Sequence, residues 1–225
     1  MWSKIMNIGI DELYTRVRIA VARARNGRST NHFVLLLTQD FSRKFIVGLM
    51  GNCGSESSTI HVSIDMGEKG SFPALLSENL RKLIESLSGI NGNTSRLNRS
   101  LEAISGFEKS QKGRFPDIHA NGIPVPVLGL GDSGDLELDL SDLFECVGHS
   151  VAASGCVLIL TITDLHLVGH SELSALVAAL HRISQLHLPI LIIGTSPSGL
   201  HRRIGLSKPY AERMFSFYDV KIPII

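Results

Sequence analysis

Two apolar runs of the sequence end in polar side chains that could do chemistry. Residues 156–162 lead into Thr163 and Asp164, and residues 190–193 are followed closely by Thr195. Both runs consist mainly of β-branched residues and leucine without polar alternation, which is typical of strands buried on both faces of a parallel sheet. The carboxyl ends of such strands meet at one edge, where ligands of open parallel sheets bind. The sequence therefore predicts a candidate site there.

A third apolar run, residues 33–38, leads into the turn TQDFSRKF at residues 38–45. A phosphate-binding loop here needs glycines, so that successive backbone N–H groups converge on a phosphate, followed by Lys and then Ser or Thr for magnesium. Lys44 is present, but Ser42 and Arg43 carry Cβ atoms where glycine is needed. Phe45 cannot bind magnesium. The turn therefore predicts weak phosphate binding or none.

Two further patterns give little support for a cofactor. The segment GLGDSG at residues 129–134 has the form GxGxxG, but prolines precede it and nearby acidic residues would repel a pyrophosphate. His166 and His170 are four residues apart near Asp164, but Gly169 lies between them and no third ligand is evident. We therefore expect neither a dinucleotide nor a metal site.

The elements that position the candidate residues follow from periodicity. Apolar side chains repeat at helical spacing between the two buried runs, so this region forms a strand–helix–strand unit whose helix is capped near Ser171. We expect an α/β fold with five parallel strands and helices on both faces of the sheet, residues 156–162 being central. The strands are expected near residues 33–38, 60–65, 156–162, 190–194 and 217–223.

Composition limits the class of protein. The 225 residues are 44% hydrophobic, which is enough for one domain over residues 1–225. The net charge of +1 argues against a dedicated nucleic-acid or membrane-surface protein. Cys53, Cys146 and Cys156 are unclustered, as in a reducing compartment. No apolar run approaches the roughly 20 residues of a membrane span, so we expect a cytoplasmic protein with no membrane partner.

A helix is predicted over residues 11–25, ending at Asn26 and Gly27. Its arginines surround an apolar stripe: Arg16, Arg18, Arg23 and Arg25. The ordinary interpretation is a solvated surface helix. Contact with nucleic acid through these arginines is the alternative.

Three segments carry a resemblance to a known family: DSGDLELDLSDLF, SELSALVAALHRISQLHLPILIIG and KPYAERMFSFYDVKIP. In this order they resemble the actinobacterial-type AAA ATPases, a family of ATP-binding proteins. The resemblance covers residues 131–224, and residues 9–13 are similar to the family's first helix. It implies a P-loop NTPase-like, AAA-type core, with ATP and magnesium as the family's ligands.

The resemblance also shows where this chain departs from the family. Members have a glycine-rich GxxGxGKT loop, the Walker A motif, and only its lysine is matched here, by Lys44. Their Walker B strand ends in Asp-Glu, where this chain has Thr163 and Asp164. Thr195 corresponds to a polar sensor. Arg213 is a candidate for the arginine that acts on a neighbouring subunit, and a helix-surface or structural ion-pair residue is the alternative. The helical lid and winged-helix region of the family is expected to be absent.

The Walker A and Walker B motifs, which bind magnesium and the triphosphate of ATP, are both altered, whereas the apolar faces of the helices and strands are kept. We therefore expect a degenerate, non-hydrolysing pseudo-ATPase that acts as a binding or interaction module, with no cofactor bound tightly. A weak ATP-binding protein or slow ATPase is the first alternative. A nucleic-acid-binding protein that uses the basic helix is the second. A protein partner or self-association is expected.

Overall fold

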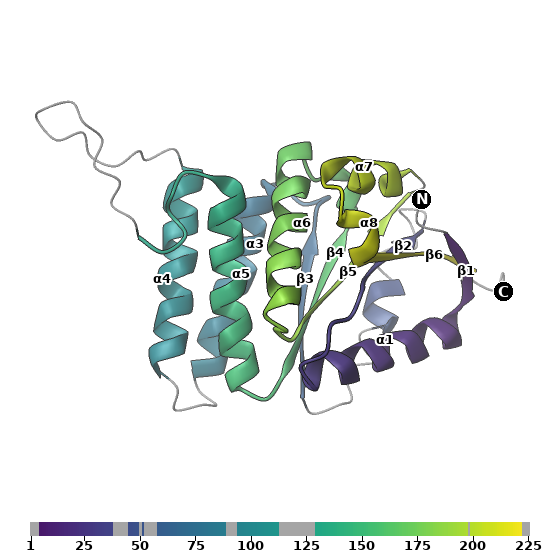
Figure 1. Ribbon diagram of the computed structural model, residues 1–225, viewed down its shortest axis with the longest axis horizontal. Helices are drawn as coiled ribbons and strands as arrows, with labels where there is room; N and C mark the ends of the chain where they lie inside the picture. Colours follow the sequence, from purple (N-terminus) through teal and green to yellow (C-terminus); the bar gives the residue numbers. More distant parts are fainter. Residues whose placement is uncertain are drawn as a thin grey trace, which may run out of the picture.

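The computed structural model describes residues 5–37, 45–49, 51, 58–88, 94–112, 129–197 and 199–221. Its centre is a six-stranded sheet in which every pairing is parallel, with the strand order β1-β6-β2-β5-β4-β3 (Figure 1). The strands are β1 (Met6–Gly9), β2 (His32–Leu36), β3 (Thr59–Asp65), β4 (Val157–Thr163), β5 (Ile190–Ser196) and β6 (Phe215–Lys221). The helices are α1 (Ile10–Arg25), α3 (Phe72–Ser88), α4 (Thr94–Gln111), α5 (Leu136–Ala153), α6 (His170–Gln185), α7 (Leu200–Ser207) and α8 (Ala211–Met214), with a 3-10 helix η1 (Leu165–Leu167).

Alternate side chains of the buried strands face two separate cores, as the two-residue period of a strand requires. On β4, Val157 and Ile159 pack with α1 and with the helical residues 45–49. Leu158, Leu160 and Ile162 pack on the opposite face, in the core that contains the apolar sides of α3, α5 and α6. The predicted α/β fold with helices on both faces is therefore confirmed.

The predicted position of the 156–162 strand is wrong. β4 lies between β5 and the edge strand β3, whereas β2 and β5 occupy the middle of the sheet. Burial on both faces is shared by every interior strand, so it carries no information on which of them is central. The sheet also has a sixth strand, β1, which the sequence analysis assigned to no element and which pairs with β6.

Several boundaries differ from expectation by a few residues. Helix α6 begins at His170, one residue before the predicted cap at Ser171, because Gly169 is the N-cap and its N–H donates to the Glu172 carboxylate at 2.9 Å. Helix α1 ends as predicted, with Gly27 at φ +62°. Glycine suits this left-handed conformation because it lacks a Cβ.

Candidate functional site

The carboxyl ends of β4 and β5 bring two predicted site residues into direct contact. The backbone N–H of Asp164 donates to the Thr195 hydroxyl at 3.2 Å, and both residues are buried. Asp164 has φ 55° and ψ 40°, a left-handed backbone that costs about 1–2 kcal/mol in an L-residue and that Asp tolerates better than most. The surrounding contacts hold the chain in this turn as it leaves the strand.

Thr163 uses its hydroxyl within the sheet. The hydroxyl donates to the carbonyl of Ile64 on β3 at 3.4 Å. In the same register, Asp65 ends β3 beside Thr163, and both residues line a cavity of about 380 Å³ with Ile46 and Val47. The sequence analysis did not single out Asp65, because only the pairing of β3 with β4 places this carboxylate next to Thr163.

The loop after Asp164 is held from two further directions. Arg203 on α7 donates to the carbonyls of His166 and Val168, the latter at 2.7 Å. Leu165 lies so close to Gly194 of β5 that a Cβ there would be 2.6 Å from the leucine side chain. Arg203 is not among the residues predicted from the sequence, since no local pattern links it to a loop 35 or more residues away.

The other predicted site residues do not join this cluster. Ser42, Arg43 and Lys44 lie outside the described residues. Arg213 is exposed on the four-residue helix α8, and among the described residues its side chain makes no hydrogen bond or ion pair. The structure therefore brings together Thr163, Asp164 and Thr195 of the predicted set.

The described part of this edge carries two carboxylates, those of Asp65 and Asp164, and the hydroxyls of Thr163 and Thr195. Magnesium in nucleotide sites is held by one or two carboxylates together with phosphate and water oxygens in octahedral geometry. The Thr163 hydroxyl donates to the Ile64 carbonyl, and the Thr195 hydroxyl accepts the backbone N–H of Asp164. Within the described ranges, no three or more His, Cys, Asp or Glu side chains are grouped so that they could hold a metal.

The GLGDSG segment serves as an internal carboxylate-binding turn. The buried carboxylate of Asp139 accepts the backbone N–H groups of Ser133 and Gly134 and the hydroxyls of Ser133 and Ser110. Two of the N–H groups that a pyrophosphate would require are therefore already engaged. These contacts fasten the turn to the end of α4.

The four arginines of α1 form two pairs on opposite flanks of the helix. Seven residues complete about two helical turns, so Arg16 lies above Arg23 and Arg18 above Arg25, with about 180° between the pairs. Arg25 donates to Ser58, and Arg18 is exposed.

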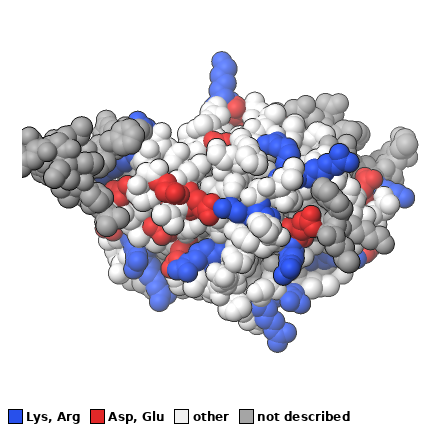
Figure 2. Space-filling model, turned by 45° about the horizontal axis from the view of Figure 1, so that its top comes forward, with Lys and Arg blue, Asp and Glu red and all other residues white. Residues whose placement is uncertain are grey.

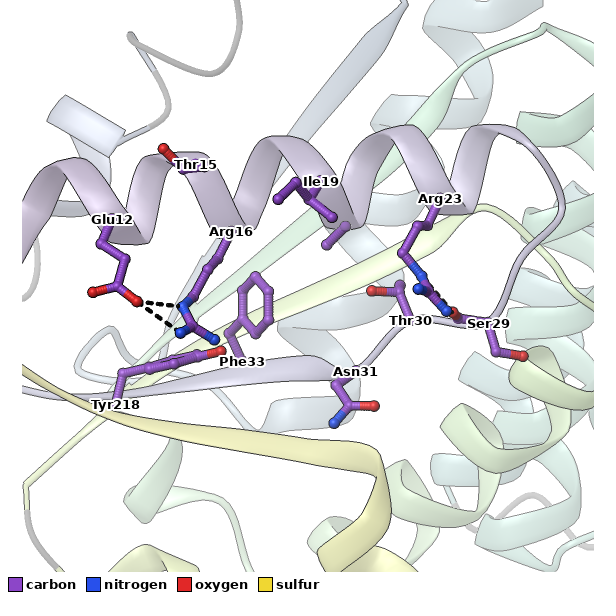
Figure 3. A pocket seen from close by; sticks show the side chains of 11 residues that line it. Glu12, Thr15, Arg16, Ile19, Arg23, Ser29, Thr30, Asn31, Phe33 and Tyr218 are labelled. Atoms are coloured by element: carbon purple, nitrogen blue, oxygen red, sulfur yellow. Dashed lines mark hydrogen bonds and ion pairs between the residues drawn. The ribbon is translucent and has the colours of Figure 1, made fainter. Parts of the chain in front are cut away.

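Arg16 and Arg23 line an open groove of about 550 Å³ between α1 and strands β2 and β6 (Figure 3). Arg16 pairs with Glu12 at 2.7 Å and lies 5.5 Å from the centre of the Tyr218 ring. Side-chain hydrogen bonds to Glu12 and Tyr218 raise the pKa of the Arg16 guanidinium, and the opposing effect of burial is smaller. Arg23 donates through two nitrogens to the carbonyl of Ser29.

No protein family and no curated protein matches this sequence. Solved structures do match this chain, among them the following three. Cdc6p from Pyrobaculum aerophilum has a TM-score of 0.53 and 12% identity over 93% of this chain and 44% of its own. The Aeropyrum pernix ORC1 protein, in complex with DNA, has a TM-score of 0.47 and 12% identity over 96% of this chain and 45% of its own. Drosophila ORC, bound to AT-rich DNA and Cdc6, has a TM-score of 0.42 and 9% identity over 95% of this chain and 58% of its own.

The likeness to the Pyrobaculum protein, at 12% identity, shows the fold alone, an α/β core whose parallel sheet is covered by helices on both faces. The chain spans less than half the length of that protein. Among the described helices, none is long and apolar enough to cross a membrane.

Proposed function

We propose that this chain is a degenerate AAA-type core, of the actinobacterial type that its sequence resembles, which acts as an interaction module without hydrolysing ATP. The observation that carries the proposal is the hydrogen bond of the neutral Thr163 side chain. The residue that replaces the first Walker B carboxylate is neutral, and its hydroxyl is directed to the Ile64 carbonyl. The altered TQDFSRKF turn supports the same conclusion from the sequence.

Weak binding of ATP is the second candidate, and one contact favours it. The hydrogen bond from the Asp164 N–H to the Thr195 hydroxyl joins the residues that the resemblance aligns with the second Walker B position and the sensor, and this contact supports a nucleotide-responsive edge. Each lost charge-assisted contact removes roughly 1.5–3 kcal/mol. Two or three such losses weaken a micromolar site to about millimolar.

Binding of nucleic acid through α1 receives less support. Arg16 and Arg23 face away from Arg18 and Arg25, so the four charges do not form one continuous patch. Arg16 is also paired with Glu12. Figure 2 shows Lys and Arg side chains interspersed with Asp and Glu over the face that it displays. A nucleic-acid surface normally gathers positive charge on one side.

A thermal-shift assay tests the proposal directly. With ATP and magnesium near the dissociation constant of a millimolar site, the stabilisation is about 0.4 kcal/mol, or about one degree in a domain of this size. Lys44→Ala should leave both the stability and this small shift unchanged. Phosphate release should not exceed that of a Thr163→Ala, Asp164→Ala variant. A shift of about five degrees, with turnover lost in that variant, would overturn the proposal.

A further inference from the structure

The groove beside α1 has a stripe of residues with a regular spacing. Arg16, Ile19 and Arg23 follow one another at i, i+3 and i+7, and all three line the groove. Ile19, a large apolar side chain between the two cations, is 55% exposed. Among the described residues, Arg23 has no carboxylate partner, because its guanidinium donates to a backbone carbonyl.

The outer side of α5 carries the opposite pattern at the same spacing. Asp135, Leu138 and Asp142 also follow at i, i+3 and i+7, and Leu138 is 59% exposed. Asp135 is the N-cap of α5, and its Oδ1 accepts the backbone N–H groups of Glu137 and Leu138, which leaves Oδ2 for another partner. The α1 stripe is about 10.5 Å long, and Leu138 and Asp142 are about 6 Å apart along α5, because each helical residue rises 1.5 Å. The order on α1 is cation, apolar, cation, and the order on α5 is anion, apolar, anion.

The environment of Asp142 is suited to a cationic partner. Burial raises the pKa of its carboxyl, and the nearby Glu145 and Asp139 raise it further, whereas a backbone hydrogen bond from Gly131 and the charge of Arg182 lower it. A guanidinium placed against this carboxylate would stabilise its charged form and so offset the effects of burial and of the neighbouring carboxylates. The two stripes cannot meet within one copy, since α1 packs on one face of the sheet and α5 on the other (Figure 1).

From these observations we infer that the α1 groove of one copy of this chain receives the Asp135–Leu138–Asp142 stripe of a second copy. Ile19 and Leu138 are the apolar centre of the contact, and the pairs Arg23–Asp142 and Arg16–Asp135 flank it. Because the two surfaces differ, the contact is heterologous, so each copy can engage one neighbour through α1 and another through α5. The inference builds on the proposed role as an interaction module and names its partner.

Charge reversal with complementation tests this contact. Sedimentation velocity of the wild-type protein at low salt, over a wide concentration range, should show self-association that weakens at high salt. Arg23→Glu and Asp142→Arg should each weaken it by roughly tenfold or more, because like charges then face each other. The double variant should recover association. An equimolar mixture of the two single variants should recover it too, since each supplies the surface that the other needs.

Arg18→Glu is the matched control, because it makes the same charge change on the opposite flank of α1 and should leave association unchanged. Far-UV circular dichroism and thermal unfolding of each variant show whether it is folded. A wild-type protein that stays monomeric throughout, or association insensitive to both reversals, would overturn the inference. So would a failure of two folded single variants to complement each other. None of these results depends on ATP, so they are distinct from failure of the proposed function.

Discussion

The edge around Asp164 and the groove beside α1 differ in where their polar groups are directed. At the edge, the Thr163 hydroxyl, the Asp164 N–H and the Thr195 hydroxyl all bond within the chain and are buried. In the groove, Arg16 and Arg23 are held in place yet present guanidinium surface to an open space. The three polar groups named at the edge are thus directed into the chain, whereas the two guanidinium groups of the groove are directed toward its open space.

The largest effect should come from the strand that supports the edge. Leu160→Ala should lower the free energy of unfolding by about 2–5 kcal/mol, because Leu160 is fully buried and the substitution leaves a cavity. Urea denaturation measures the change. Leu138→Ala, on the exposed stripe of α5, should change stability by less than about 0.5 kcal/mol. Equal effects of the two changes would show that Leu160 is not part of the core that supports the edge.

His32, at the start of β2, should make the stability of the sheet depend on pH. Its Nδ1 accepts the N–H of Ile192 at 3.2 Å, and burial lowers its pKa from 6.5 to about 4. The folded state therefore favours neutral His32. Its contribution is complete above about pH 6.5 and is lost as the pH falls toward 4, by up to about 3 kcal/mol.

His32→Asn isolates this contribution, because the amide oxygen can accept the Ile192 N–H but does not titrate. The stability difference between the wild type and this variant should change between pH 7 and pH 4, as measured by urea denaturation at each pH. His61, whose pKa burial also lowers, is present in both proteins and cancels. A difference independent of pH would contradict the assignment.

Arg203→Ala tests whether the loop after Asp164 is held by α7. Its guanidinium donates to two carbonyls, and hydrogen bonds that involve a charged group contribute a net of roughly 1.5–3 kcal/mol each when they are buried. Because Arg203 is only half-buried, we expect a net loss of about 1–3 kcal/mol in chemical denaturation. The exposed neighbour Arg202 is the control, and Arg202→Ala should cost less than about 0.5 kcal/mol. Equal stability of the two variants would show that Arg203 does not hold the loop after Asp164.

The smallest effect should be on the groove side. Glu12→Gln removes the exposed ion pair with Arg16, and such pairs contribute little, so stability should change by less than about 0.5 kcal/mol. The substitution also leaves Arg16 without a competing carboxylate, so self-association should become tighter by sedimentation velocity. Weaker association in this variant would indicate that Glu12 orients Arg16 for binding.

Much of the fold was predictable because its signals are local. The apolar runs at β4 and β5 lack polar alternation, and this alone indicates strands covered on both faces. The apolar stripe of α1 and its glycine end likewise lie within one short segment. The grouping of Thr163, Asp164 and Thr195 also followed, since parallel strands end at a common edge.

The remaining features depend on contacts between distant segments. Strand order, which places β4 next to the edge strand and Asp65 beside Thr163, is decided by packing that periodicity does not encode. The hydrogen bonds from the Arg203 guanidinium join residues 35 or more positions apart. The groove exists only because α1 lies across β2 and β6. The arginines of α1 can be counted in the sequence. Which of them face the groove is decided by how the helix packs on the sheet. Sequence patterns report which side of an element is buried, and tertiary packing decides what lies against it.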